Sequence, residues 1–555
     1  MVLRLISLAV ALAGLALLAP AAQAAVPCGQ LAGGIAASPG VKTVTSAITP
    51  AAGNNVAYCQ VNVLYGENEQ QNINIRVGLP LNSLDGGAGG VEGAWNGRTQ
   101  GIGGGGCSGS LTVTGPVNAG YVGSGNDTGH SGGSCEPGVN LDGTYNLQFI
   151  NDFIRNGMKQ QVLFSKAIAQ SYYGQRPAYN YWNGCSTGGR QGYVVAQELG
   201  TELDGILANA PAMYWTRFQT AQMWGQIVMK DLVGGPIAGA KLAQATASAV
   251  AACDAADGVT DGIIDDPRTC SFSATANVCG AASAPAANCL TEAEAEAIDL
   301  IWDGPRNARG NKVWFGLDRG TNLSGLNGGN AFGLGVTQFR WDMHDRTFDW
   351  RTVAIDEYDE VAQEGSRNIA DVTDTFGNLD TFRGSGGKLL TFVGANDQLI
   401  MPRGVIHYYR QMASRYGKHG KPDFKGLQSF FRLFRAPGVA HCGGGTGAPQ
   451  PQNLFGALVN WVENGVAPEQ ILGQTSVAGV TRTRPICLYP KTAIYSGSGS
   501  TDDAANFECG GNLEKLHTVC ADALTRYKDE VNGDLDYTGM GVNPVACEAS
   551  SRARD

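Results

Sequence analysis

The chain has 555 residues, a formal net charge of −10 and a sequence pI of about 5.2. It contains no basic run, which excludes the clustered Lys and Arg of a typical nucleic-acid-binding protein. Its 79 glycines are dispersed among apolar periodic segments, so we expect many tight turns in a folded protein instead of a helical bundle or a disordered chain. This length exceeds the usual size of one core and predicts either one large domain with an insertion or two domains.

Residues 1–24 have the layout of a secretory signal peptide. Arg4 precedes a short apolar run, and Ala22-Gln23-Ala24 forms a small-x-small cleavage site. A transmembrane anchor is the alternative, but the run is too short for one and ends at Pro20. We therefore expect an exported protein, periplasmic or secreted, that has no membrane segment after cleavage.

Fourteen cysteines agree with export, because cysteines pair in an oxidising compartment. The sequence alone leaves their connectivity open, but pairing of nearest neighbours is plausible for most and leaves Cys185 with Cys442. Zinc is disfavoured because no CxxC pair occurs and histidines are few. The expected neighbouring pairs are Cys28–Cys59, Cys107–Cys135, Cys253–Cys270, Cys279–Cys289, Cys487–Cys509 and Cys520–Cys547.

The apolar pattern predicts strands that alternate with helices, as in a mostly parallel α/β sheet. Two stretches of the chain lack this alternation: one is rich in Ala helix and aromatic residues, and the other, at the C-terminus, is polar and rich in Cys. We interpret the first as an insertion that covers the sheet and the second as a disulfide-stapled tail. The expected elements are strands at 61–65, 73–77, 177–182, 204–211, 388–393 and 428–434, and helices at 145–173, 190–199 and 453–464. The expected domains are a first core part at 25–212, the insertion at 213–378, a second core part at 379–485 and the tail at 486–555.

A candidate nucleophile, Ser186, lies between an expected strand and an expected helix. The segment Gly184-Cys185-Ser186-Thr187-Gly188 fits the pattern GxSxG, and this context is that of a nucleophile elbow. The pattern also arises by chance in a chain this rich in glycine. Because a free hydroxyl reacts poorly at neutral pH, the assignment depends on finding a base.

His441 is the candidate base. Of six histidines, it alone lies in a short loop between a strand and a helix near the end of the core. Cys442 follows it as Cys185 precedes Ser186, and a disulfide between them would hold the flanking Cα atoms about 5–6 Å apart. A structural disulfide beside an ordinary histidine is the alternative, but the four residues together favour a serine hydrolase.

Asp397 is the candidate acid, because α/β-hydrolases place an Asp or Glu between the serine and the histidine in the chain. It follows the expected buried strand at 388–393, where its carboxylate can orient His441. A turn or capping Asp is the alternative.

An oxyanion hole needs two preorganised N–H groups. Thr187, directly after the nucleophile, should supply one. The glycine-rich loop at 103–106 should supply the other from Gly104 or Gly105, since it resembles the oxyanion loop of esterases. A flexible loop without a role is the alternative.

A second candidate site lies in the insertion. Asp254, Asp257 and Asp261 place three carboxylates in one short, glycine-containing loop, where they would repel each other without a cation. Hard oxygen ligands of this kind suit a structural Ca²⁺, although the bidentate Glu of an EF-hand is missing. A solvated acidic turn is the alternative.

These segments together resemble the tannase and feruloyl esterase family over about residues 90–460. The resemblance implies an α/β-hydrolase core with a large inserted lid domain, a triad of Ser186, Asp397 and His441, and a lid calcium. The calcium ligands that it implies are the side chains of Asp254, Asp257 and Asp261 and the carbonyls of Val259 and Ile263. The motifs that carry it are Trp95-Asn96-Gly97-Arg98, Asp127-Thr128-Gly129-His130, the segment around Ser186, Cys253-Asp254-Ala255-Ala256-Asp257-Gly258, Gly386-Gly387-Lys388 and Gly438-Val439-Ala440-His441-Cys442-Gly443-Gly444.

Within that family, residues 314–324 look like the lid of mono(2-hydroxyethyl) terephthalate hydrolases. There an Arg and a Ser five positions later contact the free carboxylate of the substrate, and Arg319 and Ser324 have this spacing. A guanidinium is a natural clamp for a planar carboxylate. An Arg in a surface salt bridge is the alternative.

The sequence therefore predicts a secreted serine carboxylesterase that hydrolyses esters of aromatic acids, of the feruloyl, galloyl or terephthalate-monoester type, through an acyl-enzyme on Ser186. Its expected partner is a small aromatic ester, and we expect a monomer with structural Ca²⁺ and no organic cofactor. One alternative is a terephthalate-monoester hydrolase that uses Arg319 as the clamp. The other is a non-catalytic exported Ca²⁺-binding protein on a hydrolase fold.

Overall fold

The computed structural model describes residues 24–514, with gaps at 90–92, 308–311, 375–376 and 418–421. The expected signal peptide, up to residue 23, and the expected pair Cys520–Cys547 therefore lie outside the described residues. Within the described part of the chain, no helix is both long enough and apolar enough to span a membrane.

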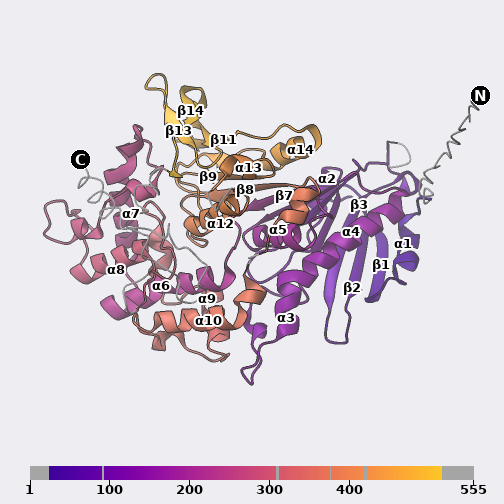
Figure 1. Ribbon diagram of the computed structural model, residues 1–555, viewed down its shortest axis with the longest axis horizontal. Coiled ribbons are helices and arrows are strands. Elements are labelled where there is room, and N and C mark those ends of the chain that lie inside the picture. The colour runs from indigo at the N-terminus through magenta and orange to yellow at the C-terminus, as the bar shows by residue number, and fades with distance from the viewer. Residues whose placement is uncertain (1–23, 90–92, 308–311, 375–376, 418–421, 515–555) are drawn as a thin grey trace, which may run out of the picture.

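A nine-stranded sheet forms the centre of the molecule, in the order β1-β2-β3-β5-β4-β6-β7-β8-β9 (Figure 1). Its first three pairings, from β1 to β5, are antiparallel, and every pairing from β5 to β9 is parallel. The expected α/β class is therefore confirmed, with a mixed sheet. The strands are β1 (Val41–Thr49), β2 (Tyr58–Tyr65), β3 (Ile73–Pro80), β4 (Arg98–Ile102), β5 (Val122–Asn126), β6 (Tyr179–Cys185), β7 (Gly205–Asn209), β8 (Lys388–Gly394) and β9 (Phe431–Ala436).

Helices cover both faces of the parallel part. Because side chains alternate along a strand, neighbours in β6 enter different cores. Trp182 packs with Tyr193 of α5, whereas Tyr181 packs with Leu458 and Trp461 of α14. Burial on both faces explains why these strands read as continuous apolar runs. The helices are α4 (Gly157–Tyr173), α5 (Thr187–Glu198), α12 (Pro402–Arg415) and α14 (Leu454–Asn464).

The chain between β7 and β8 folds as helices and short 3₁₀ turns and forms no strand in its described residues. Its helices form a layer beside the carboxyl ends of the parallel strands, in the magenta to pink part of Figure 1. Helix α8 begins with a capping box, since Thr291 and Glu294 bond each other's backbone N–H. We call this segment the helical insertion; the limits 213–378 stay a prediction. The helices are α6 (Trp215–Val233), α7 (Gly239–Cys253), α8 (Glu292–Asp303), α9 (Gly333–Asp342), α10 (Tyr358–Thr373) and α11 (Asp380–Gly384).

The C-terminal part is more ordered than the sequence pattern suggested. A three-stranded sheet pairs β10 with β11 and β11 with β12, and β12 continues past the expected boundary at 485. A hairpin of β13 and β14 follows within the expected tail. These strands are largely exposed and polar, which is why they lacked an apolar signal. They are β10 (Gln450–Pro451), β11 (Gln470–Val477), β12 (Val480–Cys487), β13 (Thr492–Tyr495) and β14 (Phe507–Gly510).

Six disulfides are formed in the described residues, and all six are pairs that the sequence predicted. They include the long-range bridge between Cys185 and Cys442, which are 257 positions apart. The other five are Cys28–Cys59, Cys107–Cys135, Cys253–Cys270, Cys279–Cys289 and Cys487–Cys509.

Candidate active site

Ser186 lies in a sharp turn between β6 and α5. Its φ of 61° and ψ of −125° place it in a region that non-glycine residues rarely adopt, and such strain is typical of functional turns. The Ser186 N–H donates to the carbonyl of Asn209 at the end of β7 (3.0 Å). Glycine is required beside it, because a Cβ on Gly184 would lie 2.4 Å from the backbone of Gly188. The turn therefore has the geometry expected for a nucleophile elbow.

His441 and Asp397 meet above the carboxyl ends of β8 and β9. The Nδ1 of His441 lies 2.8 Å from Oδ2 of Asp397. Asp397 is fully buried, and its Oδ1 accepts the N–H groups of Leu399 (2.9 Å) and Ile400 (2.8 Å). Because these donors fix the carboxylate, it can hold the imidazole in one orientation and favour the tautomer with a proton on Nδ1.

The Cys185–Cys442 disulfide joins the chain beside Ser186 to the chain beside His441. The two Cα atoms are 6.0 Å apart. Cys442 also has a positive φ, 59°, so the histidine loop turns sharply at the bridge. The disulfide thus brings the candidate nucleophile and base to the same edge of the sheet, where carboxyl ends of parallel strands usually form sites.

The glycine-rich loop packs directly against the start of α5. A Cβ on Gly103 would lie 2.4 Å from the Cα of Gly188, so only glycine allows this approach. Thr187 anchors the loop, since its hydroxyl donates to the carbonyl of Gly106 (2.5 Å). The Gly104 N–H already donates to the side chain of Gln191 (2.8 Å). Gly105 pairs with Ser108 in an isolated antiparallel bridge, in which its carbonyl accepts the Ser108 N–H (3.2 Å). The choice between Gly104 and Gly105 as oxyanion donor therefore stays a prediction.

A cavity of about 390 Å³ lies between the core and the helical insertion; Gln398 and Leu399, which follow Asp397, line it, whereas Ser186, Asp397 and His441 do not. Gln398, which lines it, accepts the backbone N–H of His441 (3.1 Å). Gln222 of α6 also lines it and donates to the carbonyl of Leu399 (2.7 Å). No charged side chain lines it among the described residues. We call it the acyl cavity; its walls include the apolar Trp224, Ile301, Phe315, Leu317, Leu326, Phe332 and Met401 and the amides of Gln222, Gln226, Asn322, Asn330 and Gln398.

Arg319 and Ser324 are not among the residues that line the acyl cavity. The guanidinium of Arg319 lies over the ring of Trp302, 5.1 Å from its centroid, and its Nε donates to the carbonyl of Phe272 (2.6 Å). Burial lowers the pKa of this arginine. The backbone N–H of Ser324 donates to Asn322. The carboxylate clamp of Arg319 and Ser324 therefore stays a prediction.

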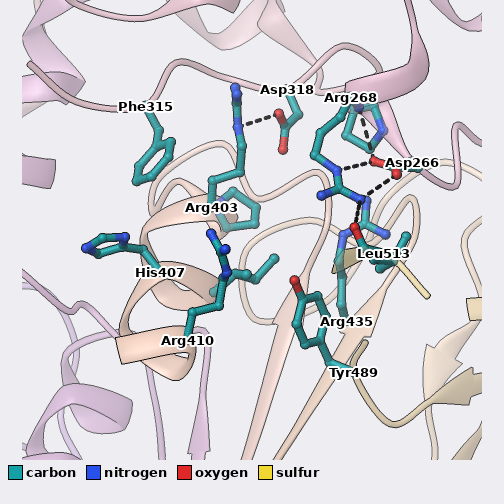
Figure 2. Close-up of a pocket in the computed structure, with 13 residues that line it drawn as sticks. Asp266, Arg268, Phe315, Asp318, Arg403, His407, Arg410, Arg435, Tyr489 and Leu513 are labelled. Atoms are coloured by element: carbon teal, nitrogen blue, oxygen red, sulfur yellow. Dashed lines mark hydrogen bonds and ion pairs between the residues drawn. The ribbon is translucent and has the colours of Figure 1, made fainter. Parts of the chain in front are cut away.

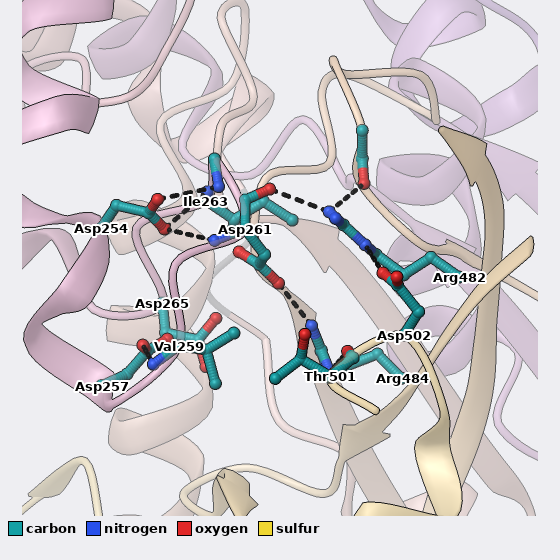
Figure 3. Close-up of polar contacts among 12 residues, drawn as sticks. Asp254, Asp257, Val259, Asp261, Ile263, Asp265, Arg482, Arg484, Thr501 and Asp502 are labelled. Carbon is teal, nitrogen blue, oxygen red and sulfur yellow. Dashed lines mark hydrogen bonds and ion pairs between the residues drawn. The ribbon is translucent and has the colours of Figure 1, made fainter. Parts of the chain in front are cut away.

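The acidic loop of the insertion is held mainly by hydrogen bonds (Figure 3). The carboxylate of Asp254 accepts the N–H groups of Asp261 (3.1 Å), Gly262 (2.9 Å) and Ile263 (3.2 Å). The carboxylate of Asp257 accepts the N–H of Val259 (2.9 Å).

Two arginines of β12 contact the same loop. Arg484 forms an ion pair with the carboxylate of Asp261, and Arg482 donates to the carbonyl of Asp261 (2.8 Å) (Figure 3). Burial raises the pKa of Asp257, and repulsion from Asp261 and Asp254 adds to this shift. Burial likewise raises the pKa of Asp265 to about 7, with a contribution from Asp257. The loop thus concentrates negative charge that β12 neutralises only in part.

The donor chemistry of this loop suits Ca²⁺, since hard carboxylates crowd together there. As they are placed, however, no three His, Cys, Asp or Glu side chains of the described residues form a group that could hold a metal. Asp254 and Asp261 instead face backbone N–H groups and Arg484.

The fold and the strained turn at its centre define the class of the protein, an α/β-hydrolase. Two solved structures have the same fold over most of the chain. Feruloyl esterase B from Aspergillus oryzae has a TM-score of 0.73 at 24% identity and covers 87% of this chain and 99% of its own. Tannin acyl hydrolase from Aspergillus niger has a TM-score of 0.72 at 22% identity and covers 85% of this chain and 91% of its own.

The chain belongs to the family described as tannase and feruloyl esterase, whose profile matches residues 91–510. A probable feruloyl esterase from Arthroderma benhamiae is 34% identical over 459 residues, which are 76% of this chain and 82% of the relative. An uncharacterised esterase from Xanthomonas campestris pv. campestris is 31% identical and covers 65% of this chain and 70% of its own. The protein is therefore a carboxylic ester hydrolase, and the family extends past the expected limit at 460 to the end of β14.

Three glutamines of the site were not predicted: Gln191, Gln222 and Gln398. Gln398 directly follows Asp397, and Gln191 follows the GxSxG motif by a few positions, but neither forms a pattern of its own. Gln222 comes from the insertion and reaches the site only through the tertiary fold. Glutamine is a common surface residue, so the residue type alone did not indicate a role in the site.

Proposed function

We propose that this ester hydrolase is a serine esterase whose triad is Ser186, His441 and Asp397. The observation that carries the proposal is the 2.8 Å contact between His441 Nδ1 and the buried Asp397 carboxylate, beside a disulfide that leads to Ser186. The strained backbone of Ser186 supports its role as nucleophile. A non-catalytic Ca²⁺-binding protein on the same fold would not require this combination of residues.

In the proposed reaction, His441 accepts the hydroxyl proton of Ser186 as the oxygen attacks the ester carbonyl. The N–H group of Thr187 and that of Gly104 or Gly105 stabilise the oxyanion, and His441 then gives its proton to the leaving alcohol. Water, deprotonated by the same histidine, releases the acid from the acyl-enzyme. The Asp397 carboxylate stabilises the imidazolium of His441 in both steps.

We also propose that the acyl group is a neutral aromatic one, bound in the acyl cavity. Its apolar and aromatic walls match the face of an aromatic ring, and its amides match phenolic hydroxyl groups. Relatives with names that specify feruloyl or tannin acyl esters support this class. The terephthalate monoester, whose free carboxylate would need Arg319, gains no support from the uncharged wall.

Two further proposals concern the export of the protein and a structural metal ion. Six disulfides support export to an oxidising compartment. The crowded carboxylates of the acidic loop support a structural Ca²⁺, which would be held by Asp254, Asp257 and Asp261 and by the carbonyls of Val259 and Ile263. Such an ion would neutralise the loop and supply no step of the reaction.

A serine-reactive phosphonate tests the triad directly. We expect labelling of Ser186 in the folded protein, detected by peptide mass spectrometry, and none in Ser186→Ala. Folded protein that stays unlabelled while it hydrolyses esters would contradict the proposal.

A panel of ferulate, gallate and terephthalate esters tests the acyl group. We expect a higher kcat/KM for the neutral aromatic acyl groups than for mono(2-hydroxyethyl) terephthalate. The reverse order would restore the terephthalate alternative. Metal analysis after dialysis, with melting in the presence of a chelator, tests calcium; bound Ca²⁺ and a lower Tm in chelator are the expected results.

A further inference from the structure

A second, smaller cavity lies where the helical insertion meets the core, and arginines surround it (Figure 2). Arg268 comes from the insertion, Arg403 and Arg410 from α12, and Arg435 from β9. Arg403, His407 and Arg410 are four and three positions apart, so they project from one side of α12. We call this cavity the basic pocket; Asp266, Asp318, Phe315 and Tyr489 also line it.

Three of the four arginines of the basic pocket form ion pairs with carboxylates. Arg268 pairs with Asp266 (2.6 Å), and Arg403 pairs with Asp318 (2.9 Å). Arg410 pairs with Glu514 (3.0 Å). These three pairs neutralise three of the four guanidinium groups.

Arg435 is the fourth arginine, and no carboxylate of the described residues forms an ion pair with it within 4.0 Å. The backbone carbonyl of Asp265, across the junction, accepts an N–H from Nη1 of Arg435 (2.6 Å). The carboxylates of Asp265 and Asp266 also act on the charge of Arg435 from beyond 4.0 Å, but burial raises the pKa of Asp265 to about 7, so this carboxylate offsets the charge only in part near neutral pH. The pocket therefore keeps an excess of positive charge in a protein whose net charge is −10.

Lys312, which pairs with Asp303 outside the pocket (2.7 Å), is close enough to feel the charge of Arg403. Burial lowers the pKa of Lys312 to about 8, and repulsion from Arg403 contributes to the shift. The four guanidinium groups line one partly buried pocket, where their mutual repulsion is stronger than in water. An anion between them would relieve it.

The size of the pocket limits the anion. Its volume is about 30 Å³, whereas one water molecule needs roughly 10–15 Å³ of such space. It therefore has room for about two waters or one small inorganic oxyanion, and excludes an organic ester. One guanidinium can donate two parallel hydrogen bonds to two oxygens of such an anion. An oxyanion is therefore a better ligand for these arginines than a halide.

We propose that the basic pocket binds one tetrahedral oxyanion of the sulfate or phosphate type, which links the helical insertion to the core. The anion would lie among Arg268, Arg403, Arg410 and Arg435 and accept N–H groups from both parts of the molecule. Because it binds only when both parts are docked, it stabilises the closed junction. The acyl cavity is a separate space, although Phe315 lines both.

Calorimetric titration with sulfate and with phosphate, at constant ionic strength, tests the site. We expect saturable binding of one anion per chain, and Arg435→Gln and Arg410→Gln should each weaken it at least about tenfold, the usual effect of losing one charge-assisted contact. Arg415→Gln is the matched control, since Arg415 lies on the same helix but pairs with Asp380 at the surface (2.9 Å). Its affinity should equal that of the wild type.

A crystal soaked in selenate locates the anion by anomalous scattering, and a peak among the four arginines is expected. Arg435→Lys keeps the positive charge but loses the paired N–H donors of the guanidinium, so it should bind the anion with intermediate affinity. This variant replaces Arg435→Gln in the test if the latter does not fold. Circular dichroism and the wild-type rate of ester hydrolysis verify that each variant is folded. Absence of saturable binding by the folded wild type, unchanged affinity in both glutamine variants, or chloride binding in place of the oxyanions would each overturn the proposal.

Discussion

Two acid–base contacts bring distant parts of the chain together, and they differ in how their carboxylates are held. Asp397, next to His441, is a single buried carboxylate with two backbone donors. Asp261, which pairs with Arg484, shares its loop with other carboxylates, and their repulsion and burial raise the pKa of Asp257. A lone, well-supported carboxylate can orient a base, whereas a crowded group needs countercharge. The first arrangement therefore suits catalysis and the second suits the joining of the insertion to β12.

The largest effect should follow from Ser186→Ala. If Ser186 is the nucleophile, kcat should fall by about 10⁵-fold or more, as when a serine protease loses its serine. Steady-state kinetics on a ferulate ester measure it. Ser429→Ala, an exposed serine that donates to Gly426, is the control and should keep full activity. A fall of less than tenfold would place the chemistry elsewhere.

Asp397→Asn should reduce kcat by about 10⁴-fold, because an amide favours the wrong histidine tautomer. The fold should survive, since the Asn oxygen can still accept the N–H groups of Leu399 and Ile400. Asp423→Asn, which changes an exposed cap of a short helix, should leave kcat unchanged. Equal activity of the two variants would mean that Asp397 is a structural turn residue.

Removal of the Cys185–Cys442 bridge should lower both stability and kcat. With 257 positions between its ends, the loop-closure model gives a loss of roughly 5 kcal/mol, against roughly 3 kcal/mol for the short Cys279–Cys289 loop. Double Cys→Ala variants of each pair, compared by Tm and by kcat below the melting range, separate the effects. Only the first pair should reduce kcat. An equal loss of kcat in both would show that the bridge acts through stability alone.

Arg484→Ala should destabilise the junction between the insertion and β12. It leaves Asp261 without its countercharge in a place where both side chains are nearly buried, which costs about 3 kcal/mol. Thermal melting measures it, and Arg351→Ala, which breaks an exposed pair with Asp349, should lower the Tm far less because solvent screens that pair. If the loop binds calcium, added Ca²⁺ should raise the Tm of Arg484→Ala and a chelator should lower it.

Arg319→Ala should have the smallest effect on catalysis. Because its guanidinium packs on Trp302 and is not part of the cavity wall, kcat/KM for a ferulate ester should change by less than about threefold, which corresponds to less than about 0.7 kcal/mol of transition-state stabilisation. The matched measurement uses mono(2-hydroxyethyl) terephthalate. A selective loss of activity on this substrate would revive the clamp formed with Ser324.

Local patterns in the sequence were sufficient for part of this protein. The GxSxG motif after a strand predicted the turn at Ser186, because steric limits on the backbone act over a few residues. The cysteines beside Ser186 and His441 predicted a bridge that the structure contains, since their chemistry requires a partner. Apolar runs such as 388–393 predicted the central strands for the same local reason.

Only the tertiary structure decided which groups meet across the fold. In the folded chain, the Gly104 N–H donates to Gln191 and Arg319 packs on Trp302. Arg484 pairs with Asp261, which is 223 positions away in the sequence. It also gathered the arginines of the basic pocket from three separate segments. Such contacts depend on how helices and strands pack, and no periodicity in the chain records them. The sequence by itself thus determined the chemistry at Ser186 and His441 that we expect, while packing between the insertion and the core determined the pockets around it.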